Sequence, residues 1–247
     1  MNVLVWAENK PLPEAERAMC ELYPQGIEGE MAGFLRKNAG LRVNTATMAD
    51  DAYGLSKESL KDTDVLVYWS HKHWKEIPDA VVDGIQTAVL EGMGLVLLHS
   101  AHASKIFSRL VGTRTQCLRW HESGEWQRVW NVAPAHQITQ GLGESFLIPH
   151  DETYGEYFEI PQPDEQVFLT VSQSGEVLRS GDCFFRGRGR IFYFSAGHET
   201  YPVYKQPEVQ KVICNAVAWA SGKRDGKWPV WAREEKSGKG ESTYDEI

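Results

Sequence analysis

Three short runs of apolar residues constrain the fold of this chain more than any other feature. They occupy residues 2–6, 65–69 and 94–99, and none of them contains a charged side chain. A strand that is apolar on both faces must be covered on both faces, which is typical of a parallel sheet lying between layers of helices. The sequence therefore predicts an α/β fold with a mostly parallel central sheet.

The segments between these runs have the spacing of amphipathic helices. Ile27, Met31, Phe34 and Leu35 fall at positions i, i+4, i+7 and i+8, so they share one face of a helix. A further strand is expected over residues 41–48. The remaining helices are expected near residues 14–22, 78–91, 104–110 and 206–220.

The second half of the chain has a different pattern, in which strands alternate with turn signals. Glycine-containing signals for hairpins occur at Ser123-Gly124, Ser174-Gly175 and Gly187–Gly189. We therefore expect antiparallel hairpins to be added to the parallel sheet. Residues 1–220 are predicted to form one domain, and residues 221–247 a polar tail whose Trp228 and Trp231 are candidates to contact the body of the protein or a second copy.

Composition narrows the classes of partner. The 247 residues carry a net charge of −8, and no basic run contains interleaved aromatic residues, so we expect no nucleic-acid partner. No apolar run approaches the roughly 18 residues of a membrane span, and the N-terminus lacks the features of a signal peptide. The cysteines lack metal or redox spacing and are interpreted as reduced thiols of a cytoplasmic protein: Cys20, Cys117, Cys183 and Cys214.

Histidines gather where the predicted strands end. The first 70 residues contain none, and ligands of open parallel sheets bind beyond the C-terminal ends of the strands. A single histidine is more often structural than functional, and His99 is expected to point inward, with His121 and His136 at the surface or in turns. The histidines at strand ends are His71, His73, His99, His102 and, beside Glu199, His198.

Several imidazoles and a carboxylate around one crevice would suit a divalent metal, with zinc the first candidate. We expect its ligands to be His71, His102 and His198. The spacings alone are not diagnostic, because there is no H-x-x-x-H on a helix and no cysteine partner. The same side chains could instead serve as acid–base groups.

Carboxylates and aromatic residues complete the predicted site. Glu152 is a candidate ligand or base, and Glu199 is placed to orient His198. Aromatic side chains near strand ends suit the apolar ring faces of sugars, although core packing is the alternative. The expected catalytic residues are His102, Glu152, His198 and Glu199, and the expected substrate contacts are Trp6, His71, Tyr154 and Tyr201.

Two common cofactors are not expected. Glu8 lies in the loop after the first strand, where a flavodoxin would place a phosphate-binding loop, and its carboxylate would repel the phosphate of FMN. No G-x-G-x-x-G follows a strand, so we expect no NAD either.

Three stretches of the sequence carry a resemblance to a known family. They are residues 94–102 (GLVLLHSAH), residues 134–142 together with 151–156 (PAHQITQGL and DETYGE), and residues 187–202 (GRGRIFYFSAGHETYP). In these stretches the chain resembles the ThuA (trehalose-utilisation) family, over roughly residues 1–220. The resemblance implies a flavodoxin-like, class I glutamine amidotransferase-like three-layer sandwich, and a sugar or keto-sugar substrate.

The resemblance also excludes one activity. Amidotransferases carry a nucleophilic cysteine on the turn after a central strand, where this chain has His99-Ser100-Ala101-His102. Thiol-dependent glutamine hydrolysis is therefore not expected. Ser100 lacks the G-x-S-x-G setting of a nucleophilic serine. His198 and Glu199 fall where amidotransferases keep their His and Glu.

Two functions remain open from the sequence. The first is an enzyme that isomerises a disaccharide or 3-keto-disaccharide or cleaves its glycosidic bond, with or without a metal. The second is a non-catalytic sugar- or metabolite-binding partner of a sugar dehydrogenase. A homo-oligomer is compatible with both.

Overall fold

One nine-stranded sheet organises the molecule, in the strand order β2-β1-β3-β4-β9-β8-β7-β5-β6. The computed structural model describes residues 1–222 except 12 and 115–117, so Cys117, Trp228 and Trp231 lie outside the described residues. The strands are β1 (Asn2–Ala7), β2 (Arg42–Thr47), β3 (Val65–Trp69), β4 (Gly94–Leu98), β5 (Arg119–Asn131), β6 (Ser145–Gly155), β7 (Glu165–Ser172), β8 (Val177–Arg186) and β9 (Gly189–Phe194).

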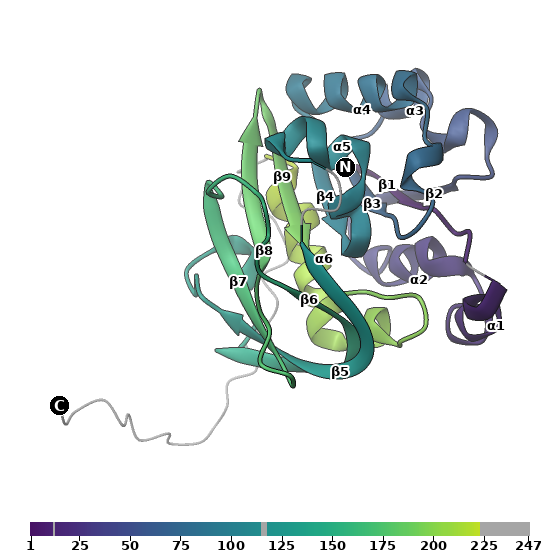
Figure 1. Ribbon diagram of the computed structural model, residues 1–247. Coiled ribbons are helices and arrows are strands. Elements are labelled where there is room, and N and C mark those ends of the chain that lie inside the picture. The colour runs from purple at the N-terminus through teal and green to yellow at the C-terminus, as the bar shows by residue number, and fades with distance from the viewer. Residues whose placement is uncertain (12, 115–117, 223–247) are drawn as a thin grey trace.

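Helices cover both faces of the parallel part, as the apolar strands predict (Figure 1). The helices are α1 (Pro13–Leu22), α2 (Gly26–Leu35), α3 (Lys57–Lys61), α4 (Asp79–Glu91), α5 (Lys105–Phe107) and α6 (Pro207–Ala220). Side chains of α1, α2 and α6 pack on one face of the sheet. Side chains of α3, α4 and α5 pack on the other face, which makes a three-layer sandwich.

The sheet changes direction at β9. Strands β2, β1, β3, β4 and β9 are parallel, whereas β8, β7, β5 and β6 continue the sheet with antiparallel pairing. Because parallel strands end at the same edge, the residues that follow β3, β4 and β9 are brought together. The fold predicted from the sequence is therefore confirmed.

Two local predictions are wrong. No hairpin forms at Ser123-Gly124, because β5 runs continuously through these residues, and Gly124, at φ 64°, lies in a register shift against β6. A glycine inside a strand pattern marks a bulge as readily as a turn. The helix expected over residues 104–110 is only the short α5, which continues as a π turn over Ser108–Gly112.

Within residues 1–222, apart from the four undescribed positions, no helix is both long enough and apolar enough to cross a membrane.

Candidate active site

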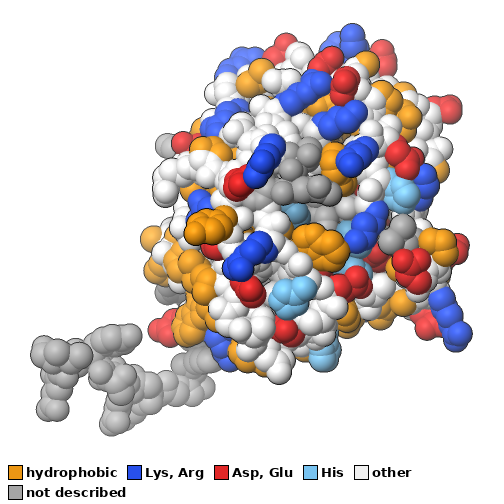
Figure 2. Space-filling model, in the orientation of Figure 1, with side chains coloured by type: hydrophobic (Ala, Val, Ile, Leu, Met, Phe, Trp, Pro, Cys, Tyr) orange, Lys and Arg blue, Asp and Glu red, His pale blue; other side chains and the backbone are white. Residues whose placement is uncertain are grey.

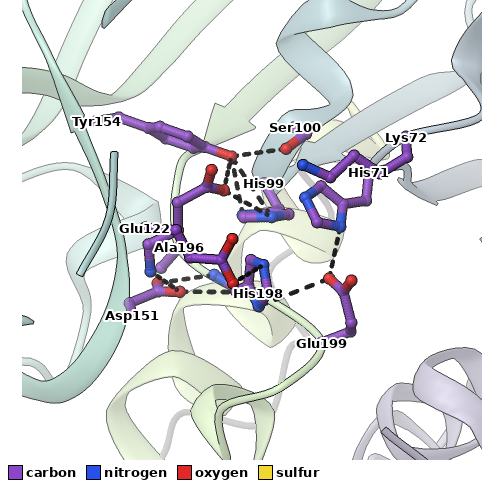
Figure 3. A network of polar contacts seen from close by, with 12 residues as sticks. His71, Lys72, His99, Ser100, Glu122, Asp151, Tyr154, Ala196, His198 and Glu199 are labelled. Carbon is purple, nitrogen blue, oxygen red and sulfur yellow. Dashed lines mark hydrogen bonds and ion pairs between the residues drawn. The ribbon is translucent and has the colours of Figure 1, made fainter. Parts of the chain in front are cut away.

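The side chains of the site come from four strand ends. His71 follows β3, the 3-10 turn His99–Ala103 follows β4, and His198 and Glu199 follow β9. Glu152 and Tyr154 reach the same place from the antiparallel strand β6. In Figure 3 the labelled side chains of His71, His99, Tyr154, His198 and Glu199 converge on one centre, and all five are buried.

His71 and Glu199 form a close contact in the middle of the site. Nδ1 of His71 lies 2.6 Å from Oε2 of Glu199, and both side chains are almost fully buried. The two atoms are poorly aligned for a hydrogen bond, and neither they nor Nε2 of His71 have another hydrogen-bond partner among the described residues. Burial acts to raise the pKa of Glu199, but the adjacent His71 ring lowers it below the usual range overall, so Glu199 stays ionised.

His99 occupies a strained position. It is the first residue after β4, and its φ of 56° lies in the left-handed region that side chains other than glycine rarely adopt. Its ring is fully buried and stacks on Trp69 at 6.1 Å between centroids. Burial, and then the neighbouring histidines, hold the pKa of His99 well below its usual range. The sharp turn thus places a neutral imidazole in the centre of the site.

Three imidazoles surround a common point. The ring centroids of His71 lie 5.0 Å from His99 and 4.7 Å from His198, and His99 lies 5.5 Å from His198. Ligand atoms from these three residues and Glu199 all lie within 4.8 Å of one another. This set differs from the predicted ligands, since His99 takes the place of His102.

The potential ligand atoms of this cluster differ in whether they are free to coordinate a metal. Nε2 of His71 has no hydrogen-bond partner among the described residues, which suits metal coordination. Nδ1 of His198, in contrast, accepts the backbone N–H of Thr200 at 3.2 Å, so that lone pair is already used. His71 therefore fits a divalent ion better than His198 does, and His99 and Glu199 are the other members of the set.

A second group of potential ligands does not fit a metal. His136, Glu165 and Cys183 lie close together near α6. Nδ1 of His136 accepts the backbone N–H of Ile138, so the proton is on Nε2, which donates to Glu165 at 3.0 Å. Burial also raises the pKa of the Cys183 thiol well above its usual range. His136 thus lies in a turn, as expected.

His102 packs against Tyr154 and is not a member of the imidazole cluster. Its ring centroid is 5.0 Å from that of Tyr154, and Nδ1 lies 3.2 Å from the carbonyl oxygen of His99. Nδ1 lies at the same distance from the hydroxyl of Tyr193, which can donate to it or accept from it. Burial lowers the pKa of His102 to about 4, so its imidazole is neutral near pH 7.

A chain of hydrogen bonds ends on Glu152. The hydroxyl of Tyr154 donates to Oε2 of Glu152 at 2.7 Å, so the 2.6 Å contact between Ser100 and Tyr154 is donated by Ser100. Burial raises the pKa of Glu152, partly offset by the Tyr154 bond, and also raises the pKa of Tyr154 well above its usual range. Tyr154 therefore remains a donor, and Glu152 is a carboxylate with increased basicity.

Asp151 joins the two halves of the site. Its carboxylate accepts the backbone N–H groups of Gly197 at 2.9 Å and His198 at 3.0 Å. This contact fixes the loop after β9 against β6. Burial raises the pKa of Asp151 to about 7 despite these hydrogen bonds.

A cleft of about 190 Å³ opens above these groups. His71, His102, Glu152 and Tyr154 line it, and Trp120, which is 56% exposed, stands at its mouth. Figure 2 shows histidine atoms at the bottom of a hollow bordered by hydrophobic and basic side chains. The cleft thus combines an aromatic platform with buried acid–base groups.

Two predicted substrate contacts lie elsewhere. Trp6 is fully buried, stacks on Tyr68 at 4.4 Å and donates its Nε1 proton to the carbonyl of Tyr53, so it has no surface to offer a substrate. A strand that is apolar on both faces buries its aromatic residues too. Tyr201 lies beside His198, at 5.5 Å between ring centroids, outside the cleft lining.

Sequence reasoning missed several residues of the site. Asp151 and Trp120 carried no spacing signal, because β6 and β5 reach the site only through the fold of the antiparallel half. Lys72 was overlooked between His71 and His73, although its position directly after a strand was a usable signal. His99 was expected to point inward, which it does, but into the cluster.

Comparisons with known proteins agree with this architecture. A ThuA-like protein from Parabacteroides merdae has 15% sequence identity to the chain and a TM-score of 0.62, covering 93% of each. A ThuA-like protein from Bacteroides uniformis has 18% identity and a TM-score of 0.58, covering 89% of this chain and 91% of its own. A GMP synthase-like protein from Thermoplasma acidophilum has 12% identity and a TM-score of 0.50, covering 90% of this chain and 94% of its own. At these identities the likeness shows the fold alone.

The sequence itself matches a family model. A comparison with curated proteins gives no match. The model of the ThuA family, described as trehalose utilisation, matches residues 2–220, which confirms the resemblance seen in the sequence. The chain therefore belongs to the ThuA family.

Proposed function

We propose that the protein acts on a 3-keto-disaccharide bound in the cleft, by removing the proton on the carbon beside the carbonyl group. The observation that carries this proposal is Glu152, a buried carboxylate with a raised pKa that lines the cleft. A base of this kind is suited to abstracting a weakly acidic C–H proton.

The cleft has features of a sugar site. The exposed ring of Trp120 offers a flat apolar surface of the kind on which a sugar ring can stack. Ser100 and His102 provide polar groups further in. The trehalose-utilisation description of the family supports the same class of substrate.

The first step is common to isomerisation and cleavage. Glu152 accepts the proton, the C–H bond breaks, and its electron pair moves onto the carbonyl oxygen as an enolate. Isomerisation returns a proton at a different atom. In cleavage the carbonyl re-forms, a C=C bond forms to the carbon that carries the glycosidic oxygen, and that C–O bond breaks. The glycosidic oxygen takes the proton held by Glu152 and leaves as an alcohol. Tyr154 holds the Glu152 carboxylate in place throughout.

A divalent ion, with zinc the first candidate, would be held by His71, His99 and Glu199, with His198 adjacent. It would act as a Lewis acid on the carbonyl oxygen.

The three free cysteines of the described residues are consistent with action in the cytoplasm. An assembly of several copies stays a prediction from the sequence.

The test is turnover of 3-ketotrehalose in D₂O, followed by NMR. The wild type should exchange the proton beside the carbonyl for deuterium and release product. Glu152→Gln should lower the rate about 100-fold or more, because general-base catalysis contributes 10²–10⁴-fold. Glu91→Gln, at an exposed position on α4, is the control. Tight sugar binding without exchange or product would instead identify a binding protein.

A further inference from the structure

Among the described residues that line the cleft, the only lysines are Lys72 and Lys75, and there is no arginine. His102, with its pKa lowered to about 4 by burial, is neutral near pH 7. Proton removal beside a carbonyl places negative charge on the carbonyl oxygen. A positive group at that oxygen stabilises this charge, and the lysines are the candidates that the chain itself supplies, with or without a metal in the imidazole cluster.

The backbone beneath Lys72 is held by a buried carboxylate. Glu8, only 2% exposed, accepts hydrogen bonds from the hydroxyl of Ser70 and from the backbone N–H groups of His71 and Lys72, at 2.8, 3.0 and 2.9 Å. Three bonds to one carboxylate fix the direction in which the chain leaves β3. The stem of Lys72 is thus positioned before any substrate binds.

The side chain of Lys72 is directed into the site. In Figure 3 it extends toward Ser100, beside the ring of His71. Its Nζ lies 5.0 Å from the ring centroid of Trp120, at the mouth of the cleft. No carboxylate lies within ion-pair distance of it among the described residues, so its charge is free to act on a ligand.

The charge of Lys72 influences the pKa values of Glu152 and His198. Burial raises the pKa of Glu152, and Lys72 is among the groups that oppose this rise. Burial also lowers the pKa of His198, and Lys72 adds to that effect. Lys75 differs, because its side chain is exposed and lies over Trp74.

We propose that Lys72 is a further catalytic residue, whose ammonium group binds the carbonyl oxygen of the substrate and stabilises the negative charge that forms there. Glu152 and Lys72 would then stand on opposite sides of the reacting C–C=O unit, one taking the proton and the other holding the oxygen. This role rests on the proposed function. The sugar ring would stack on Trp120, which lies beside Lys72 at the mouth of the cleft.

The kinetic test compares Lys72→Met with Lys37→Met, which removes the same charge at an exposed position outside the cleft lining. Lys72→Met should lower kcat about 100-fold with a small change in KM, because the interaction strengthens only in the transition state. Lys37→Met should change kcat by less than about threefold, since an exposed charge is screened. Lys72→Arg should recover part of the loss. An unchanged kcat in Lys72→Met would overturn the proposal and assign the oxygen to another cation.

A binding test separates this role from the proposed reaction. Calorimetry should find that the wild type binds lactobionate, a disaccharide acid with a planar oxyanion, more tightly than neutral lactose. Lys72→Met should abolish the preference, and Lys37→Met should keep it. No preference in the wild type, or a preference retained by Lys72→Met, would overturn the role of Lys72. A preference that depends on Lys72 without keto-sugar turnover would support the oxyanion site and reject the reaction.

Discussion

Nε2 of His71 is a buried atom with no hydrogen-bond partner among the residues the structure describes, whereas Nδ1 of the same ring lies 2.6 Å from Oε2 of Glu199. Leaving a buried polar atom unpaired costs about 1–3 kcal/mol, unless a ligand satisfies it. The divalent metal that we propose for this cluster would be such a ligand. His102 has a different environment, since its Nδ1 faces the carbonyl oxygen of His99.

The matched pair His71→Ala and His102→Ala tests this difference. Protein purified without a histidine tag should contain about one zinc per chain in the wild type and in His102→Ala, and far less in His71→Ala, because a three-ligand set loses its best-placed donor. Plasma mass spectrometry measures the content. Equal zinc in the two variants, or no metal in any of the three proteins, would contradict the assignment.

The positions of the site residues were predictable from the sequence to different degrees. The rule that ligands bind at the ends of parallel strands found His71, His102 and His198, because it needs only the strand boundaries. It could not choose between His99 and His102 as members of the imidazole cluster. That choice depends on the backbone of His99, whose φ of 56° turns the ring into the cluster.

Helix α6 and strand β4 lie close together at Gly94, where there is no room for a side chain. A Cβ built on Gly94 would lie 2.5 Å from the carbonyl oxygen of Ala220, the last residue of α6. Gly94→Ala should therefore force α6 away from β4 and destabilise the fold by about 1–3 kcal/mol. Urea unfolding measures the change.

Gly33→Ala is the control for this prediction. Gly33 is exposed within α2, and a Cβ there would meet no atom within 4 Å. Alanine should stabilise that helix by up to about 1 kcal/mol. If Gly94→Ala were as stable as the wild type, the close contact between α6 and β4 would be wrong.

The elements of the parallel half were easier to predict than those of the antiparallel half. Runs such as residues 65–69 are apolar throughout, and their shortness and their β-branched and aromatic residues favour a buried strand. Strand β5 is different, because only Gln127 and Val129 of its residues are buried and it contains Gly124 within a bulge. Gly124 has the positive φ that both a turn and a bulge require. Pairing with β6 decides which of the two forms, and this pairing cannot be read from the local sequence.

Across the whole molecule, buried titratable groups act on stability in opposite directions. Burial lowers the pKa of His102 and His198 to about 4. The unfolded chain takes up these protons first, near pH 6.5, so the two histidines weaken the fold as pH falls from about 6.5 to 4. Burial raises the pKa of Asp151 and Asp182 to about 7. The folded chain keeps protons that the unfolded chain has lost, so these carboxyls weaken the fold as pH rises from about 4 to 7.

Asp182→Asn isolates one of these opposing contributions. Asp182 is fully buried in β8, and its two carboxylate oxygens have no hydrogen-bond partner among the described residues. Asparagine keeps the shape and does not titrate. The stability of the variant relative to the wild type should therefore increase as pH rises from about 4 to 7, on the order of 1 kcal/mol per pH unit, and should level off above pH 7. Urea unfolding at pH 4.5, 6 and 8 measures the trend, with Asp83→Asn, at an exposed position on α4, as the control. A stability difference that does not change with pH would mean that Asp182 is ionised in the folded protein and that its charge is compensated.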